Sequence, residues 1–176
     1  TINILEACRK NNVKRIVYTS TGGARVGEPE YLPVDENHPL NPCSPYGISK
    51  HTAEHYVWMY NKLYGLDYLM FCFGNVYGPR DDPITKRVTA IFASKMIKGE
   101  TPKIFGDGGQ TRDFIYVKDA IEVMYYFFKN PDKTGIYNLG TGTARSWNDI
   151  AKAMFGALGK KENIKYIEMP KYLKAK

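Results

Sequence analysis

Short apolar runs alternate with segments of helical periodicity along this chain. Runs rich in β-branched and aromatic residues predict buried strands, and apolar positions three and four residues apart predict amphipathic helices. The predicted strands cover residues 15–20, 66–73, 103–105, 114–117, 135–139 and 164–168, and the predicted helices cover residues 2–11, 46–64, 88–98, 119–129 and 146–159. Strands that alternate with helices indicate βαβ units, so we expect an α/β fold with a largely parallel sheet.

A tyrosine and a lysine four residues apart, Tyr46 and Lys50, begin the second predicted helix. Residues at this spacing share one face of a helix, so the ammonium can stabilise the phenolate. A phenolate can take a proton from a hydroxyl while a nicotinamide ring takes a hydride. The spacing alone is a weak signal, because the pairs Tyr125/Lys129 and Tyr172/Lys176 match it as well.

The surroundings of Tyr46 and Lys50 distinguish this pair from the other two. Ser44 and a proline precede it, as expected for an N-cap and a first helical turn. The hydroxyl triplet Thr19–Thr21 ends a predicted strand, and Thr21 lies 25 residues before Tyr46. Ligands of parallel α/β sheets lie at the carboxyl ends of the strands, so a hydroxyl of this triplet and the helix can meet at one site.

Five stretches occur in the order that is typical of one family: VYTSTGGA, SPYGISK, GNVYGPR, KIFGDGGQTRDFIYV and YNLGTG. With them the sequence resembles the extended short-chain dehydrogenase/reductase family, which is also called the NAD-dependent epimerase/dehydratase family. The resemblance covers nearly the whole chain. Residues 15–117 are most similar to UDP-glucose 4-epimerases, and the final stretch is more similar to ADP-glyceromanno-heptose 6-epimerases.

The resemblance implies a role for each matching residue. It implies that Tyr46 is the catalytic acid/base, that Lys50 holds the cofactor ribose, and that Thr21 binds the sugar hydroxyl and helps its proton move. Ser20 is the alternative to Thr21 and is also a candidate cofactor contact, with Tyr46 and Lys50. The other implied substrate contacts are Asn75 at the phosphate or sugar, Lys103 and Phe105 at the nucleotide base, and Arg112 at the diphosphate.

A structural role without ligand contact stays open for several of these residues. The alternatives are that Thr21 merely ends a strand, that Asn75 stabilises the turn before Gly78, that Phe105 is ordinary core, that Arg112 pairs with Asp107 or Asp113, and that Tyr46 and Lys50 form a surface pair.

The resemblance also implies the fold and the cofactor. It implies an incomplete Rossmann-like parallel sheet that binds NAD, with residues 1–74 as the carboxy-terminal part of the NAD-binding domain. Residues 75–176 are then mostly a smaller substrate-binding lobe with returning Rossmann elements. The family's glycine-rich turn, which receives the cofactor diphosphate, does not occur in this sequence. Because a helical pattern starts at Ile2, we expect the chain to be the later part of a longer protein and to be inactive and bind NAD weakly by itself.

The residues after Thr21 indicate which reaction of the family to expect. Dehydratases resemble one another in an Asp-Glu pair at this point, and decarboxylases in a Glu, whereas this chain has Gly22 and Gly23. We therefore expect NAD-dependent epimerisation of a nucleotide-diphosphate sugar, as in UDP-glucose/UDP-galactose 4-epimerases. The Arg-x-Gly-Asp segment usual in 4-epimerases is absent from the sequence, so an ADP-heptose 6-epimerase or another NDP-sugar oxidoreductase or dehydratase stays an alternative. A protein that binds or senses NAD(H) or a nucleotide sugar without turnover is the non-enzymatic alternative.

Composition and charge narrow the range of partners. The net charge of +7 arises from Lys and Arg spread along the chain without a basic run, which favours a phosphate-bearing substrate over nucleic acid. No apolar run approaches the roughly 20 residues of a membrane span, so no membrane partner is expected. Three separated cysteines without a CxxC pair predict neither a disulfide framework nor a zinc site and favour a reducing, cytoplasmic location.

Two further features of the predicted helix 46–64 concern binding. His51 and His55 have a spacing that can bind a metal ion, but no third ligand is evident, so no metal is expected. The resemblance implies that this helix can join two copies into a homodimer, and Val57, Trp58 and Tyr64 are candidates for such a face.

Overall fold

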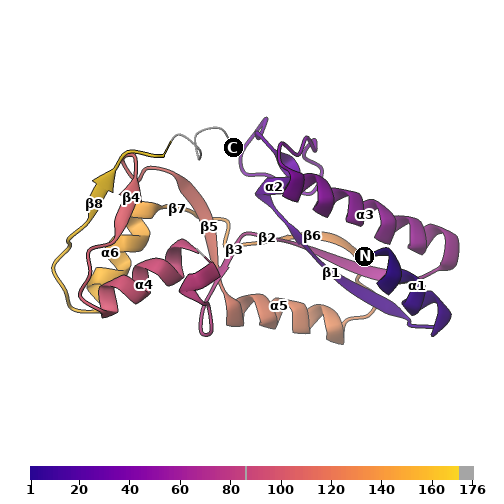
Figure 1. Ribbon diagram of the computed structural model, residues 1–176. Coiled ribbons are helices and arrows are strands. Elements are labelled where there is room, and N and C mark those ends of the chain that lie inside the picture. Colours follow the sequence, from indigo (N-terminus) through magenta and orange to yellow (C-terminus); the bar gives the residue numbers. More distant parts are fainter. Residues whose placement is uncertain (86, 171–176) are drawn as a thin grey trace. The chain divides into compact units, whose positions relative to one another are not determined.

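The computed structural model describes residues 1–85 and 87–170, so the Tyr172/Lys176 pair lies outside the described residues. The chain divides into two compact units, Thr1–Gly74 with Asp119–Gly140, and Asn75–Lys118 with Thr141–Lys176. Each unit is described by itself below, and its elements are labelled as in Figure 1.

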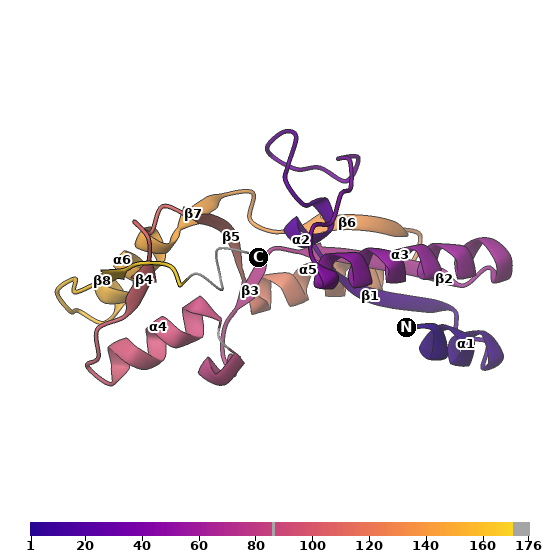
Figure 2. The ribbon, with the colours of Figure 1, turned by 45° about the horizontal axis from the view of Figure 1, so that its top comes forward.

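The first unit contains a three-stranded parallel sheet. Its order is β1 (Arg15–Thr21), β2 (Asp67–Phe73) and β6 (Gly135–Leu139). β1 pairs with β2 along its whole length, from Arg15 opposite Asp67 to Thr21 opposite Phe73. Helix α3 (Pro45–Tyr64) lies along one face of the sheet and α5 (Val117–Lys129) along the other (Figures 1 and 2). The expected α/β architecture with a parallel sheet is confirmed.

The face of the sheet under α3 carries a compact apolar core. Its buried residues are Leu5 of α1 (Ile2–Lys10), Val57, Tyr60, Leu66 and Met70. Val57 is fully buried, so its prediction as part of an exposed dimer face is wrong. The physical reason is helical periodicity, which turns Val57 toward the sheet.

Alternation of side chains along β2 supplies the core on the opposite face. Phe71 is buried there, and its ring packs against Phe127 of α5 with 5.3 Å between ring centroids. Phe127 in turn contacts Tyr137 of β6 at 4.5 Å. The near-continuous burial of β2 is typical of a strand with helices on both faces.

In its described residues, the second unit contains two small sheets and two α-helices. β5 (Thr111–Tyr116) pairs in parallel with β3 (Asn75–Tyr77) and antiparallel with β7 (Ala144–Ser146). β4 (Lys103–Phe105) pairs with β8 (Lys165–Ile167), and the helices are α4 (Val88–Ile97) and α6 (Trp147–Ala157). The core of this unit consists of Phe92, Met96, Ile104, Ala151 and Phe155.

The longer elements and the short strands β4 and β8 lie where the sequence pattern predicts them, but four other short elements were not predicted. The predictions lack helix α2 (Gly23–Val26), the 3-10 turn η1 (Pro83–Thr85) and strands β3 and β7. Each of these spans three or four residues, which is too short to show a period of 3.6 or of 2. None of the described helices is long and apolar enough to span a membrane.

Helix α1 is fixed to α3 by a charged cluster around Glu6. The Glu6 carboxylate accepts hydrogen bonds from the Arg9 guanidinium at 2.6 and 3.0 Å and from the Tyr60 hydroxyl at 3.2 Å. The bond from Arg9 is the main cause that lowers the pKa of Glu6 from 4.5 to about 2. The folded state therefore keeps this carboxylate charged at a pH where the unfolded chain protonates it.

We expect this cluster to contribute an acid-dependent part of the stability. A lowered folded-state pKa gives a contribution that is complete above pH 4.5 and is lost as the pH falls toward 2. Urea unfolding at pH 7 and pH 3 measures it: the wild type should lose more stability on acidification than Glu6→Gln. Equal losses in the two proteins would contradict the assignment.

Candidate active site

The amino-terminal end of α3 is fixed by its capping residues. Ser44 adopts an extended backbone, and its hydroxyl accepts a hydrogen bond from the Gly47 amide at 3.1 Å. Pro45 occupies the first turn, and Gly65 ends the helix in the left-handed conformation. The predicted N-cap is confirmed, and Tyr46 therefore lies in the first helical turn.

The Lys50 ammonium joins α3 to the carboxyl end of β1. It donates a hydrogen bond to the main-chain carbonyl of Thr19 at 2.9 Å. It also lies 5.3 Å from the centroid of the Tyr18 ring and 5.9 Å from that of the Tyr46 ring. Both distances permit a cation–π attraction. The structure thus brings Tyr46 and Lys50 together, at the end of the predicted strand.

Tyr18 forms the inner wall of this arrangement. Its hydroxyl lies 3.4 Å from the Lys50 carbonyl oxygen, which it can reach as a donor. Burial, followed by the nearby charges of Glu54 and Tyr46, raises the pKa of Tyr18. Tyr18 therefore stays neutral at ordinary pH and places an aromatic ring beside the Lys50 ammonium.

The phenol of Tyr46 is open to a ligand. Its side chain is among the exposed aromatic residues, and Tyr46 is 54% exposed. The next residue, Gly47, allows α3 to approach α2 closely, because a Cβ at this position would lie 2.1 Å from the Ala24 carbonyl oxygen. The glycine is thus required for the close contact that holds the first turn of α3.

The hydroxyls of Ser20 and Thr21 are used differently. Ser20 is buried, and its hydroxyl donates a hydrogen bond to the Glu54 carboxylate. Thr21 is half-buried at the last position of β1, and its hydroxyl has no hydrogen-bond partner within the described part of the chain. Thr21 can therefore meet a ligand, whereas the Ser20 hydroxyl is already engaged. The contact of Thr21 with a sugar and that of Ser20 with a cofactor stay predictions.

A buried ion pair next to the site was missed by the sequence analysis. Arg25 of α2 and Glu54 of α3 are each 5% exposed, and their charged groups are 3.1 Å apart. Burial raises the pKa of the neighbouring Cys72 thiol to about 11, so this thiol is neutral beside the pair. Nothing in the sequence indicated that these residues are buried, because Arg25 is a single Arg in a glycine-rich segment and Glu54 is a single Glu on a helix.

The four residues predicted to bind the substrate's nucleotide and phosphates belong to the second unit. Asn75 begins β3 opposite Phe114, and Lys103 and Phe105 are the ends of β4. Asn75 and Lys103 are exposed, and Phe105 is half-buried. Binding of a nucleotide or sugar by these residues stays a prediction.

Arg112 lies directly opposite a second arginine. In the antiparallel ladder of β5 and β7, Arg112 pairs with Arg145. Both side chains are exposed, and neither forms an ion pair with a carboxylate in the part of the chain that the structure describes. Like charges directly opposite each other are unfavourable unless an anion lies between them. Arg145 was missed because only the strand register, which β7 was too short to reveal, brings it next to Arg112.

The described contacts include no ion pair of Arg112 with Asp107 or Asp113, which were the alternatives to ligand binding. The Arg112 guanidinium donates to the Thr111 carbonyl oxygen at 2.7 Å. The carboxylate of Asp113 instead accepts hydrogen bonds from the Thr141 and Gly142 amides, and Asp107 accepts one from the Gly109 amide. Arg112 is therefore available to an anionic ligand.

The two histidines of α3 form a hydrogen-bonded chain. His51 Nδ1 lies 3.0 Å from the Glu54 carboxylate, and the Nε2 atoms of His51 and His55 are 3.2 Å apart. Among the described residues, no group of three or more His, Cys, Asp or Glu side chains is placed to hold a metal ion.

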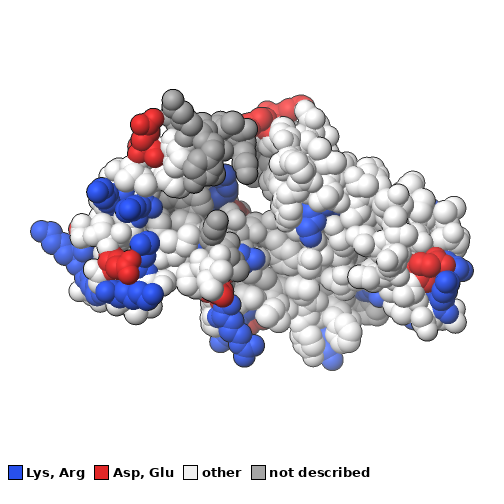
Figure 3. Space-filling model, viewed as in Figure 1, with Lys and Arg blue, Asp and Glu red and all other residues white. Residues whose placement is uncertain are grey.

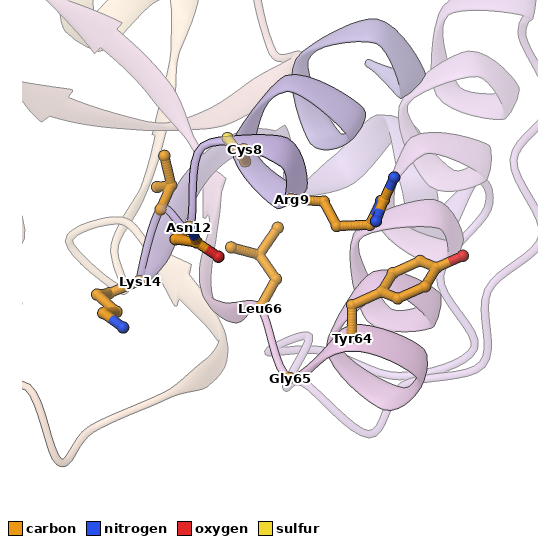
Figure 4. Close-up of a pocket in the computed structure, with 8 residues that line it drawn as sticks. Cys8, Arg9, Asn12, Lys14, Tyr64, Gly65 and Leu66 are labelled. Atoms are coloured by element: carbon orange, nitrogen blue, oxygen red, sulfur yellow. The ribbon is translucent and has the colours of Figure 1, made fainter.

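A small pocket lies at the other end of α3, away from Tyr46. It has a volume of about 160 Å³ and is lined by residues of the end of α1, the loop after it and the end of α3, including Cys8, Arg9, Tyr64 and Leu66 (Figure 4). Because Tyr46 and Lys50 lie at the beginning of α3, this pocket is not part of the candidate site. On the face drawn in Figure 3, basic side chains are interspersed with acidic ones and form no continuous band.

The fold and the site together define a class of protein. A parallel sheet with helices on both faces, and a Tyr-Lys pair at the start of a helix that meets a strand's carboxyl end, are the features of a Rossmann-fold short-chain dehydrogenase/reductase. The chain belongs to the NAD dependent epimerase/dehydratase family, whose profile matches residues 1–140.

Curated proteins with two kinds of name are similar to this chain. It is 52% identical over 153 residues to a protein of Methanocaldococcus jannaschii that is provisionally named UDP-glucose 4-epimerase, with 85% of this chain and 49% of that protein covered. It is 38% identical over 147 residues to the ADP-L-glycero-D-manno-heptose-6-epimerase of Nitratidesulfovibrio vulgaris, with 78% and 45% covered. The chain thus spans about half the length of these relatives. The expected similarity to both kinds of epimerase is confirmed.

Solved structures of the same family superimpose on the chain. The UDP-glucose 4-epimerase of Thermotoga maritima with UDP-glucose matches with a TM-score of 0.89 and 35% identity, over 97% of this chain and 55% of that one. The UDP-glucose 4-epimerase of Thermus thermophilus complexed with NAD matches with a TM-score of 0.83 and 36% identity, over 99% and 61%. The Rossmann-like fold expected from the sequence is therefore confirmed.

We expect Gly47→Ala to destabilise the protein by about 1–3 kcal/mol, because the added methyl group must push α3 away from the Ala24 carbonyl. Urea unfolding measures the change. Gly156→Ala is the matched control, since this glycine also lies in a helix and a Cβ there meets no atom within 4 Å. Equal stability of the two variants would show that the close approach at Gly47 has no energetic consequence.

Proposed function

We propose that the whole protein carrying this chain catalyses NAD-dependent epimerisation of a nucleotide-diphosphate sugar, of the UDP-glucose/UDP-galactose 4-epimerase kind. The observation that carries the proposal is the Lys50 ammonium, which is held by the Thr19 carbonyl and faces the ring of an exposed Tyr46. Membership of the NAD dependent epimerase/dehydratase family supports the same reaction class.

The residues present fit the reactive part of a dinucleotide cofactor. The exposed Tyr46 phenol and the ammonium of Lys50 offer a donor and a cation at the carboxyl end of β1, where parallel sheets bind nucleotides. When bound, NAD supplies the chemistry of accepting a hydride from a carbon and returning it. Lys50 would hold the cofactor ribose. Ser20, the other residue predicted to contact the cofactor, immediately precedes Thr21, whose hydroxyl is free.

Tyr46 and Thr21 would handle the proton of the reacting hydroxyl. Tyr46, as phenolate stabilised by the Lys50 charge, would take the proton from the sugar hydroxyl as that carbon is oxidised. It would return the proton after the sugar has presented its other face. The free hydroxyl of Thr21 would orient the same oxygen. Lys50 acts electrostatically in both directions, so its fixed position serves the forward and the reverse step alike.

The arginine pair would bind the diphosphate of the substrate. Arg112 and Arg145 are opposite each other across β5 and β7 and share one face of this ladder. Two planar guanidinium groups suit the oxygens of a diphosphate, whose charge removes the repulsion between them. Asn75, Lys103 and Phe105 of the same unit are the proposed contacts of the sugar and the base.

A second candidate activity is ADP-heptose 6-epimerisation. It is favoured by the 38% identity to a heptose 6-epimerase over 147 residues. Assays with UDP-glucose and with an ADP-heptose, run on the same protein, distinguish the two.

Dehydration is disfavoured as the reaction. Gly22 and Gly23 follow Thr21, so no acidic side chain is present there for a dehydration step.

We expect Tyr46→Phe to lower kcat by about 10²- to 10⁴-fold while NAD affinity is kept, because the variant loses the proton-transfer group and keeps the ring. Tyr125→Phe is a matched control. Tyr125 forms a similar pair with Lys129, whose ammonium lies 5.3 Å from the Tyr125 ring, and this pair is far in sequence from the candidate site. Unchanged turnover in Tyr46→Phe would contradict the proposed chemistry. Binding of NAD and nucleotide sugar without any turnover by the wild type would favour a sensor instead.

We expect Arg145→Gln to raise the KM for the nucleotide sugar about 10- to 100-fold with little effect on kcat, because a charge-assisted hydrogen bond to phosphate is lost. Arg112→Gln should behave in the same way. Lys152→Gln removes the same charge from an exposed position on α6 and is the control. An unchanged KM in Arg145→Gln would exclude Arg145 from the diphosphate site.

A further inference from the structure

The single acidic residue of α3, Glu54, contacts side chains from three elements. Its carboxylate accepts a hydrogen bond from the Ser20 hydroxyl of β1 and from Arg25 Nε of α2 at 3.1 Å. It also lies 3.0 Å from Nδ1 of His51, one turn earlier on α3. Glu54 and Ser20 are 5% and 6% exposed, so these bonds form away from water.

These contacts involve residues that are close in sequence to, or share a helix face with, the members of the proposed catalytic set. Glu54 follows Lys50 by four residues and Tyr46 by eight, so the three lie on one face of α3, about one turn apart. Ser20 immediately precedes Thr21. The hydrogen bond from Ser20 to Glu54 therefore joins β1, which carries Thr21, to α3, which carries Tyr46 and Lys50.

The charge of this cluster is balanced inside the protein. Arg25 is buried with Glu54, and the two form an ion pair at 3.1 Å. A buried pair of this kind is weak evidence for added stability, because both groups lose their hydration. A buried charge is instead costly to move once its partners are in place. The cluster thus links β1, α2 and α3 through hydrogen bonds to one carboxylate.

We propose that Glu54 is a positioning residue, which acts through the Ser20 hydroxyl to hold Thr21 in register with Tyr46 and Lys50. The inference rests on the proposed function. It assigns Ser20 to the protein interior and not to the cofactor. Misplacement of reacting groups by about 1 Å can cost about 100-fold in rate, so a hydrogen bond at this point can control kcat without touching the substrate.

The test uses Ser20→Ala in the full-length protein, because this change removes the bond to Glu54 and leaves the Arg25–Glu54 ion pair intact. We expect kcat to fall about 10- to 100-fold, with the KM for the nucleotide sugar and the Kd for NAD unchanged. Ser20→Thr keeps the hydroxyl and should restore kcat. Glu54→Gln should lower kcat similarly and also lower the Tm, because Arg25 is then buried without its counter-charge.

The matched control is Thr134→Val. The Thr134 hydroxyl donates to the Asp67 carboxylate at 2.6 Å, at the opposite end of the same parallel sheet. Its loss removes a bond of the same kind and should leave kcat unchanged. Hydrogen exchange of residues 19–21 and 46–50 should rise in Ser20→Ala and stay constant in this control.

The outcomes separate the possible roles. A fall in Tm with unchanged kcat in Ser20→Ala would overturn the proposal and leave a purely structural cluster. A weaker NAD affinity with unchanged kcat would overturn it in favour of direct cofactor contact. If the wild type epimerises its substrate and Ser20→Ala keeps full activity, the positioning role of Glu54 is refuted and the proposed function stands. If the wild type is inactive, the proposed function is refuted together with the positioning role that depends on it.

Discussion

The arrangement of the site depends on one hydrogen bond, from the Lys50 ammonium to the carbonyl oxygen of Thr19. This bond connects α3 to the carboxyl end of β1 and places a positive charge against the Tyr46 ring. A lysine side chain has several rotatable bonds, and its charge acts on a phenol only if the ammonium is held close. The main-chain carbonyl supplies an acceptor whose position is set by the pairing of β1 with β2. The geometry of a parallel sheet thereby determines the electrostatics of a side chain on a neighbouring helix.

The fold was predictable wherever a segment was long enough to show its period. The helix that follows the N-cap Ser44 has capping residues at both ends, and the strand at residues 67–73 is a buried run. Both lie where they were expected. β3 and β7 have three residues each and exist because β5 offers them hydrogen bonds. Such elements are defined by a partner distant in sequence, which local pattern does not contain.

The candidate site was predictable in part for a similar reason. The spacing of Tyr46 and Lys50 is local, so the sequence sufficed to place both on one helical face. The contacts of Glu54 with Ser20 and Arg25 join residues 34 and 29 positions apart, and a lone glutamate on a helix ordinarily points to solvent. Arg145 became evident only through its register with a distant strand. Burial and strand register are tertiary properties, and they identified Glu54, Arg25 and Arg145 as candidate site residues.

The contact made at Thr19 has a consequence for altering this protein. Lys50 is held there by the backbone, and the Thr19 side chain itself is exposed. The main-chain carbonyl of residue 19, and not its side chain, therefore sets the position of the ammonium. Tyr18 and Ser20 face α3, so the Thr19 side chain points to the other face of β1. A change of side chain at residue 19 should therefore leave the acceptor of the ammonium in place.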